Sequence, residues 1–136
     1  MKILILGASG LLGNTFLEFY KKKKLSKKLK LYFTLRKRNK NYIYFDVDKE
    51  QSYKNIQKLN PDIVVNCIGA IKPFIKEEIP GTIINAIKLN SIFPKNLVKI
   101  FPKSKIIHFN TDCVYSGKSG NYSEKDKHDY NDIYGM

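Results

Sequence analysis

The sequence has little cysteine, few acidic residues and no long apolar run. Its two cysteines, Cys67 and Cys113, lie far apart and match no metal-ligand spacing, so we expect no metal site and a reduced, cytoplasmic setting. No apolar segment approaches the roughly 20 residues that cross a bilayer, and no leader-like series of charged, apolar and small residues is present. These absences favour a protein that works away from membranes.

The shortage of acidic residues leaves a strong positive charge. Twelve Asp and Glu face 25 Lys and Arg, giving a formal net charge of +13, and seven lysines fall between residues 21 and 30. Such a balance is typical of nucleic-acid binders, which would bind with a steep salt dependence. Lys, Asn and Ile are abundant along the whole chain, however, so we interpret the charge as a compositional bias and expect no nucleic-acid partner.

The pattern of apolar residues predicts a single α/β domain over residues 1–136. A content of 43% apolar residues is ample for one packed core. Strands that alternate with helices predict a Rossmann-type, doubly wound parallel sheet with helices on both faces. We expect strands at 2–6, 29–35, 42–45, 62–68 and 105–109, and helices from residue 11 into the lysine run, over 48–59 and over 79–101.

Three- and four-residue spacing predicts the buried faces of these helices. Asp48 is expected to cap the middle helix, Pro94 to kink the last helix or begin a new turn, and His108 to be packed in the core. The expected buried stripe is Leu12, Phe16, Phe19 and Tyr20 on the first helix and Ile83, Ile84, Ile87, Leu97, Val98 and Phe101 on the last.

A glycine-rich turn follows the first apolar run and opens the first helix. In this strand-turn-helix context the free N–H groups of the helix start favour a pyrophosphate. Gly7 would permit the tight turn, Gly10 the close approach of phosphate, and Gly13 the packing of helix on strand. The predicted cofactor-binding residues of this turn are Gly7, Ser9, Gly10, Leu11, Leu12 and Gly13.

The ends of the four later strands are expected at the same edge of the predicted sheet. Arg36 follows the second strand with no acidic residue beside it, which favours the 2′-phosphate of NADP over the ribose hydroxyls of NAD, although NAD stays possible. Asp46 and Val47 follow the third strand and are predicted to meet the adenine. The sequence Cys67-Ile68-Gly69 follows the fourth strand, and we expect it to line the same cleft as the glycine turn and Asn110-Thr111-Asp112.

The C-terminal third carries a set of spaced motifs. Asn110-Thr111-Asp112-Cys113-Val114-Tyr115-Ser116-Gly117 is followed by Tyr122-Ser123-Glu124 and then by Asp132-Ile133-Tyr134-Gly135. With Pro61-Asp62-Ile63-Val64-Val65-Asn66 and Asn90, they resemble the extended short-chain dehydrogenase/reductase superfamily. Within it the chain is similar to the dTDP-4-dehydrorhamnose reductase family, whose pattern is Ser-Thr-Asp-aromatic-Val-Phe, a Gly, Tyr-x-Glu and Tyr-Gly-x-x-Lys.

The resemblance implies an NADP-dependent reductase. Such an enzyme passes a hydride to a nucleotide-linked 4-keto-deoxysugar in surface polysaccharide biosynthesis, with a sugar nucleotide as substrate. By the same resemblance Tyr134 is the catalytic acid and a cofactor-binding residue, while the Thr111 hydroxyl orients the sugar oxygen. Asp112 and Cys113 would border the substrate.

The match to the family has departures, which keep alternatives open. Asn110 replaces the usual serine, and Cys113 replaces an aromatic residue, which puts the identity of the sugar in doubt. The family's lysine four positions after Tyr134 falls beyond Met136. On this basis we expect an N-terminal portion of a longer enzyme, inactive alone and able to form a homodimer when complete. The alternatives are an epimerase or dehydratase, for which Asp112-Cys113 offers one carboxylate where dehydratases carry two, and a non-catalytic nucleotide-binding subunit.

Overall fold

The five expected strands form one parallel sheet. A computed structural model describes residues 1–23, 26 and 28–136; positions 24, 25 and 27 of the predicted lysine run lie outside the described residues. The strand order is β3-β2-β1-β4-β5, with every pairing parallel, so the doubly wound Rossmann-type sheet is confirmed. The strands are β1 (Lys2–Leu6), β2 (Lys30–Leu35), β3 (Ile43–Tyr44), β4 (Ile63–Asn66) and β5 (Lys105–His108).

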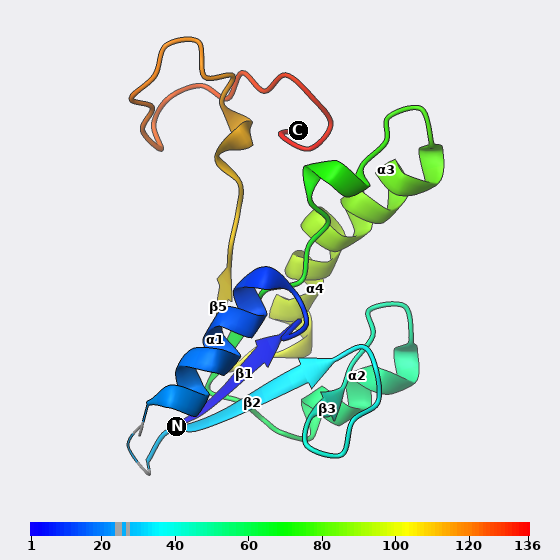
Figure 1. Ribbon diagram of the computed structural model, residues 1–136, viewed down its shortest axis with the longest axis vertical. Coiled ribbons are helices and arrows are strands. Elements are labelled where there is room, and N and C mark those ends of the chain that lie inside the picture. Colours follow the sequence, from blue (N-terminus) through cyan, green and yellow to red (C-terminus); the bar gives the residue numbers. More distant parts are fainter. Residues whose placement is uncertain (24–25, 27) are drawn as a thin grey trace.

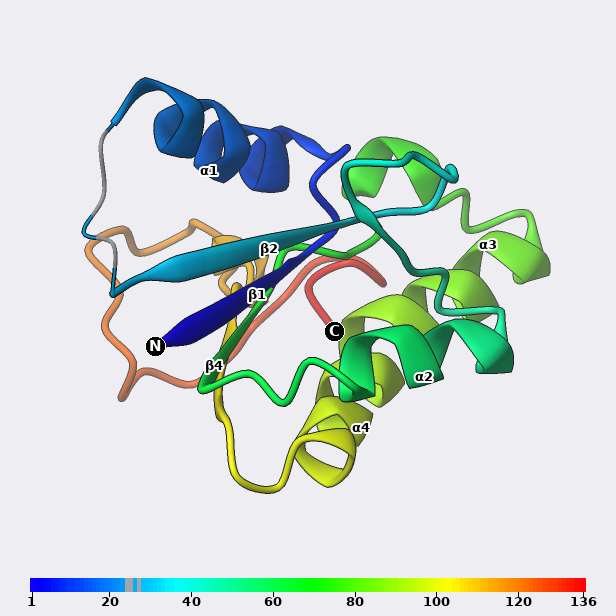
Figure 2. The ribbon, with the colours of Figure 1, turned by 90° about the horizontal axis from the view of Figure 1, so that it is seen from below.

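Helices cover both faces of the sheet. Helix α1 (Leu11–Lys22) lies on one face, α2 (Glu50–Gln57) and α4 (Phe93–Ile100) lie on the other, and α3 (Pro80–Ile87) continues α4 past the sheet edge (Figures 1 and 2). Alternation along β1 divides the core between the two faces. The core on the α1 side is Ile5, Ala8, Leu17, Phe33 and Val65, and the core on the other side is Leu4, Leu6, Phe45, Ile56, Val64, Phe93, Leu97 and Phe101.

The predicted helix over 79–101 contains a change of pitch. Between α3 and α4 lies the π-helical turn η2 (Lys88–Ile92), in which the Phe93 N–H donates to the Lys88 carbonyl five residues back. Pro94 begins the new turn, as expected, because it has no N–H to continue the ladder. A π turn holds one extra residue and therefore rotates the helix after it. The predicted stripe was wrong in part: Ile84, Ile87 and Val98 are exposed, and the buried residues are Ala86, Phe93, Leu97 and Phe101.

The buried face of α1 also differs from the prediction. Leu12, Phe19 and Tyr20 are 36%, 53% and 36% exposed, whereas Gly13 and Leu17 are buried. The reason is that Gly13 lets the helix backbone approach the β1–α1 turn closely, so the contact is centred on small residues rather than on the long side chains.

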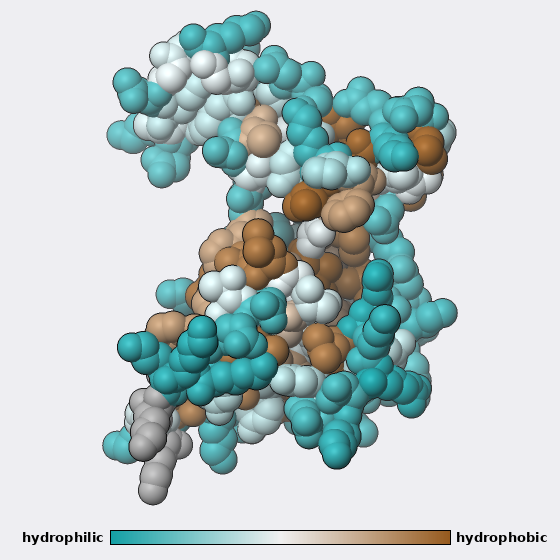
Figure 3. All heavy atoms as spheres, viewed as in Figure 1, coloured by the Kyte–Doolittle hydropathy of each residue, from teal (hydrophilic) through white to brown (hydrophobic). Residues whose placement is uncertain are grey.

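The C-terminal segment leaves the sheet after β5 and turns back toward the β4–α3 connection (Figure 1). After β5 the chain forms the short 3-10 turn η3 (Asp112–Val114), a loop, and a last stretch that ends beside the 3-10 turn η1 (Lys72–Phe74) of the β4–α3 connection (Figure 1). Figure 3 shows hydrophobic surface in the hollow between this segment and the sheet and over the adjoining helices. Ile71 and Phe74 of the β4–α3 connection and Ile84 of α3 are each more than half exposed. Among the described residues, no helix combines the length and the hydropathy that a membrane span requires.

Candidate nucleotide and substrate site

The glycine turn between β1 and α1 depends on the conformation of Gly7 and on the uncapped start of α1. Gly7 adopts φ +82°, a left-handed conformation that favours glycine, and its carbonyl oxygen accepts from the Gly10 N–H at 3.1 Å. Gly10 is the N-cap of α1 and supplies no capping side chain, and the first turn holds no acidic residue. The helix start therefore presents N–H groups and the positive end of its dipole to an anion.

Thr34 fixes this turn from the neighbouring strand. Its side-chain oxygen accepts from the Gly7 N–H at 3.0 Å, its carbonyl accepts from the Ala8 N–H at 3.0 Å, and the residue is 1% exposed. Sequence reasoning missed this role. The available signal was a threonine near the end of an otherwise apolar strand, placed beside the turn by the parallel pairing of β1 and β2.

A cavity of about 220 Å³ lies over the carboxyl ends of β1 to β4. It brings together predicted residues that are far apart in sequence: the glycine turn, Arg36, the Asp46-Val47 pair, and the three residues after β4. Leu11 is 92% exposed and, like Leu12 and Gly13, does not line it. The lining residues are Gly7, Ser9, Gly10, Thr34, Arg36, Phe45, Asp46, Val47, Asp48, Cys67, Ile68, Gly69, Asn85 and Leu89.

Asp46 and Asp48 form the far wall of this cavity. The Asp46 carboxylate accepts from the Asp48 N–H at 3.0 Å, and the Asp48 carboxylate pairs with Lys88 of η2. The prediction that Asp48 caps α2 is therefore wrong: Lys49 occupies the N-cap, and Ser52 bonds back to Asp46 instead. Asp48 lies one residue before the N-cap, and its carboxylate faces Lys88 instead of the helix start.

The backbone after β4 is fixed by two asparagines. Asn66, 1% exposed, accepts from the Ile68 N–H at 3.1 Å, and Asn90 bonds both backbone groups of Ala70, at 2.8 and 2.9 Å. Between them, Cys67 is half-buried, and burial raises the pKa of its thiol to about 11. The cavity wall here is therefore rigid and neutral.

His108 is not the packed core residue that we expected. It is exposed at the end of the edge strand β5, with Nδ1 3.1 Å from the Asn66 amide nitrogen. Since the Asn66 oxygen already accepts from the Ile68 N–H, its nitrogen is the donor, and His108 Nδ1 must accept. Desolvation lowers the pKa of His108, which agrees with a neutral ring.

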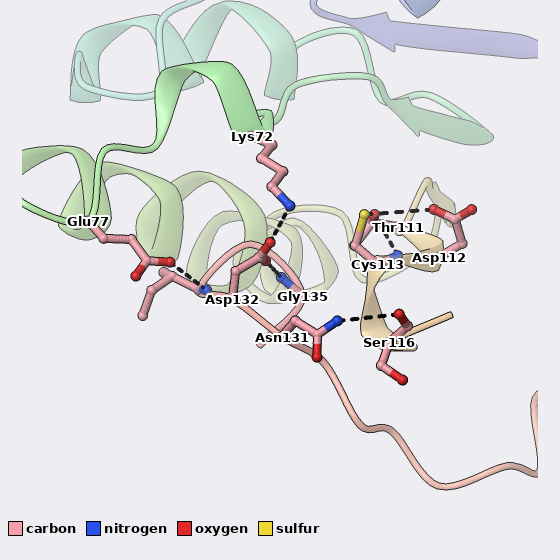
Figure 4. Close-up of polar contacts among 10 residues, drawn as sticks. Lys72, Glu77, Thr111, Asp112, Cys113, Ser116, Asn131, Asp132 and Gly135 are labelled. Carbon is pink, nitrogen blue, oxygen red and sulfur yellow. Dashed lines mark hydrogen bonds and ion pairs between the residues drawn. The ribbon is translucent and has the colours of Figure 1, made fainter. Parts of the chain in front are cut away.

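The predicted substrate residues form a second cluster. Thr111 caps η3 by accepting from the Cys113 N–H at 3.1 Å, and the Cys113 carbonyl packs against Gly135, next to Tyr134. Thr111, Asp112, Cys113 and Tyr134 thus belong to one region, shown in part in Figure 4. None of them lines the 220 Å³ cavity, so the expected single cleft is instead a cavity and a neighbouring cluster.

The sheet order, the glycine turn and the cavity together define a Rossmann-type α/β fold with an open site at the carboxyl edge of its sheet. A family model described as the RmlD substrate binding domain matches residues 1–136. The chain belongs to this family. A comparison with curated protein sequences gives no significant match.

Solved structures agree with this assignment. A hypothetical dTDP-4-dehydrorhamnose reductase from Sulfolobus tokodaii is 28% identical, with a TM-score of 0.74, over 99% of this chain and 48% of that one. A dTDP-4-dehydrorhamnose reductase from Clostridium acetobutylicum is 26% identical, with a TM-score of 0.75, over 99% and 45%. The fold is also that of the Bacillus anthracis enzyme in complex with NADP, at 22% identity and a TM-score of 0.75 over 98% and 44%. The chain thus spans just under half the length of these relatives.

Proposed function

We propose that this chain is the dinucleotide-binding part of an NADP-dependent reductase that transfers a hydride to a nucleotide-linked 4-keto-deoxysugar in surface polysaccharide biosynthesis. The observation that carries the proposal is the cavity in which the uncapped start of α1 meets Arg36 at the end of β2. The similar reductases and the NADP complex of the Bacillus anthracis enzyme support the cofactor and the reaction class.

The residues of the cavity fit a dinucleotide. A Cβ at Gly10 would meet only the Gly7 carbonyl oxygen, at 3.5 Å, so the space over the turn is open for phosphate oxygens. Arg36 is the basic side chain in the lining and is placed for a 2′-phosphate, which a guanidinium binds in a bidentate manner. Val47, Leu89 and Ile68 supply apolar surface for an adenine ring.

The chemistry at the second cluster follows from its hydrogen bonds. The cofactor supplies the hydride when it is bound. Thr111 Oγ1 accepts from the Cys113 N–H, which leaves the hydroxyl proton free to donate to the sugar carbonyl oxygen. Tyr134 donates the proton that the same oxygen needs as charge develops on it. Cys113, where relatives place an aromatic ring, leaves a smaller wall beside the sugar.

Nucleotide titration tests the proposal. Purified chain is titrated with NADPH and with NADH, following nicotinamide fluorescence at two salt concentrations. We expect saturable NADPH binding, abolished by Gly10→Asp because a carboxylate then occupies the phosphate position. Arg36→Ser should weaken NADPH binding by roughly tenfold and leave NADH binding unchanged, since a charged hydrogen bond contributes about 1.5 kcal/mol.

The control is Lys37→Ser, which removes the same charge from the neighbouring, exposed position. An equal loss of NADPH affinity in the Arg36 and Lys37 variants would show that general positive charge, and not a specific contact of Arg36 with the 2′-phosphate, supports binding. A folded chain that binds neither nucleotide would refute the proposal.

A further inference from the structure

The stretch that carries Tyr134 is fastened to the β4–α3 loop, defined here as residues 67–79. Lys72 Nζ lies 2.5 Å from Asp132 Oδ2, and Glu77 Oε1 accepts from the Ile133 N–H at 3.3 Å (Figure 4). The two partners are the two residues directly before Tyr134. The loop therefore grips this stretch at two adjacent positions, 60 and 56 residues away along the sequence.

The two carboxylate oxygens of Asp132 bond to different partners, one within its own turn and one in the β4–α3 loop. Oδ1 accepts from the Gly135 N–H at 3.0 Å, and the Asp132 carbonyl accepts from the Met136 N–H at 3.1 Å, so residues 132–136 form one turn around Tyr134. Oδ2 is left for Lys72. The hydrogen bond between the two charges raises the pKa of Lys72 and lowers that of Asp132, so both stay charged over a wide pH range.

Close packing fixes the other side of the turn. A Cβ at Gly135 would lie 2.2 Å from the Cys113 carbonyl oxygen, so the chain after Tyr134 rests directly on η3. Tyr134 is thus flanked by Lys72 and Glu77 on its N-terminal side and by Cys113 on its C-terminal side.

The same loop borders the nucleotide cavity. Cys67 and Gly69 line that cavity, and Asn90 holds Ala70 by both backbone groups. Lys72 follows only two residues later. The side chain that pairs with Asp132 therefore follows directly on the wall against which the nucleotide would lie.

We infer that Lys72 and Glu77 are positioning residues that hold Tyr134 at η3 and tie its location to the nucleotide-binding wall. The inference rests on the proposed function for the role of Tyr134 as proton donor. The contacts of Lys72 with Asp132 and of Glu77 with the Ile133 N–H, called the clamp below, do not depend on the role of Tyr134 and are measured separately.

Amide hydrogen exchange of residues 131–136 tests the clamp. Lys72→Met should speed exchange of the Ile133, Gly135 and Met136 amides by roughly threefold, as expected for loss of an exposed ion pair. Lys72→Arg should restore protection. The matched control is Lys76→Met, which removes the same charge from the same loop at a position that makes no side-chain bond among the described residues.

Asp132→Asn separates the two tasks of the aspartate. The amide oxygen keeps the bond to the Gly135 N–H, while the negative partner of Lys72 is lost. We expect this variant to behave like Lys72→Met, and the double variant to be no worse than either single one. Additive effects of the two substitutions, or equal exchange in the Lys72→Met and Lys76→Met proteins, would overturn the inference.

A spectroscopic readout follows Tyr134 itself. In protein labelled at the tyrosine ring carbons, the Tyr134 signal is assigned by its loss in Tyr134→Phe. Lys72→Met should move this signal and Lys76→Met should not, with the melting temperature unchanged in both. An unmoved signal in Lys72→Met would overturn the inference, whereas absence of NADPH binding would refute the proposed function and leave the clamp result standing.

Discussion

A methyl group at position 13 has no room in this fold. A Cβ there would lie 2.3 Å from the Gly7 carbonyl oxygen, 2.8 Å from its carbon and 2.9 Å from the Ala8 Cα. All three are backbone atoms of the β1–α1 turn, so no side chain can rotate away. Gly13→Ala must therefore displace the start of α1 from the turn that we propose binds phosphate.

Two opposing effects set the magnitude. Alanine in place of glycine inside a helix normally stabilises it by about 1 kcal/mol. Overpacking costs about 1 to 3 kcal/mol, and contacts this short with rigid backbone put Gly13 at the upper end of that range. We expect a net loss of about 1 to 2 kcal/mol, or roughly 4 to 8 °C in melting temperature for a chain of this length.

The control lies in another helix of the same protein. Gly81, in α3, has nothing within 4 Å of its Cβ position, so Gly81→Ala should gain up to about 1 kcal/mol from propensity alone. Urea and thermal unfolding, followed by circular dichroism, compare the two variants. A Gly13→Ala protein as stable as Gly81→Ala would refute the close-packing argument, and NADPH titration would then show whether the turn is unaffected as well.

Single contacts give three further predictions. At pH 8, Cys67 should react with iodoacetamide roughly a hundredfold more slowly than an ordinary thiol, because its pKa of about 11 leaves little thiolate; mass spectrometry of a Cys113→Ser variant checks the rate, and rapid labelling would contradict the burial. The folded pKa of His108 is lowered, so its contribution to stability is full above the ordinary value of about 6.5 and is lost as pH falls through the folded value. The free energy of unfolding, measured in urea, should be lower at pH 5 than at pH 7.5, and His108→Gln should make this difference smaller. An equal difference in the variant would assign the pH dependence to other groups. Asn90→Ala should cost about 1 to 2 kcal/mol, since it leaves two loop backbone groups unpaired, and wild-type unfolding and NADPH affinity in this variant would contradict the role given to Asn90.

The strands and the cavity were predictable because they depend on short, local patterns. Short, β-branched apolar runs bounded by turn residues, such as Ile63–Asn66, favour buried strands between helices. Parallel pairing then brings the carboxyl ends of the strands to one edge, so Gly10, Arg36 and Gly69 line one cavity although they are far apart in sequence.

The helix faces were less predictable because they depend on backbone geometry that single residues do not reveal. The stripe through Ile84 and Val98 assumed a constant pitch, which the turn at Lys88–Ile92 breaks. The stripe on α1 assumed that large side chains make the contact, whereas Gly13 makes it.

The pairing of Lys72 with Asp132 could not be predicted from the sequence. The two residues are 60 positions apart, and both look like ordinary surface charges.

The π turn makes the length of the 80–100 segment as important as its composition. One residue deleted between Lys88 and Ile92 would restore a regular α-helix and turn everything after it by about 100° relative to α3. Either Leu97 would then leave the core or Asn90 would leave Ala70, since the two helices could no longer satisfy both contacts. The segment can accept substitutions without a change of register, whereas a single-residue deletion must be matched by an insertion in the same turn.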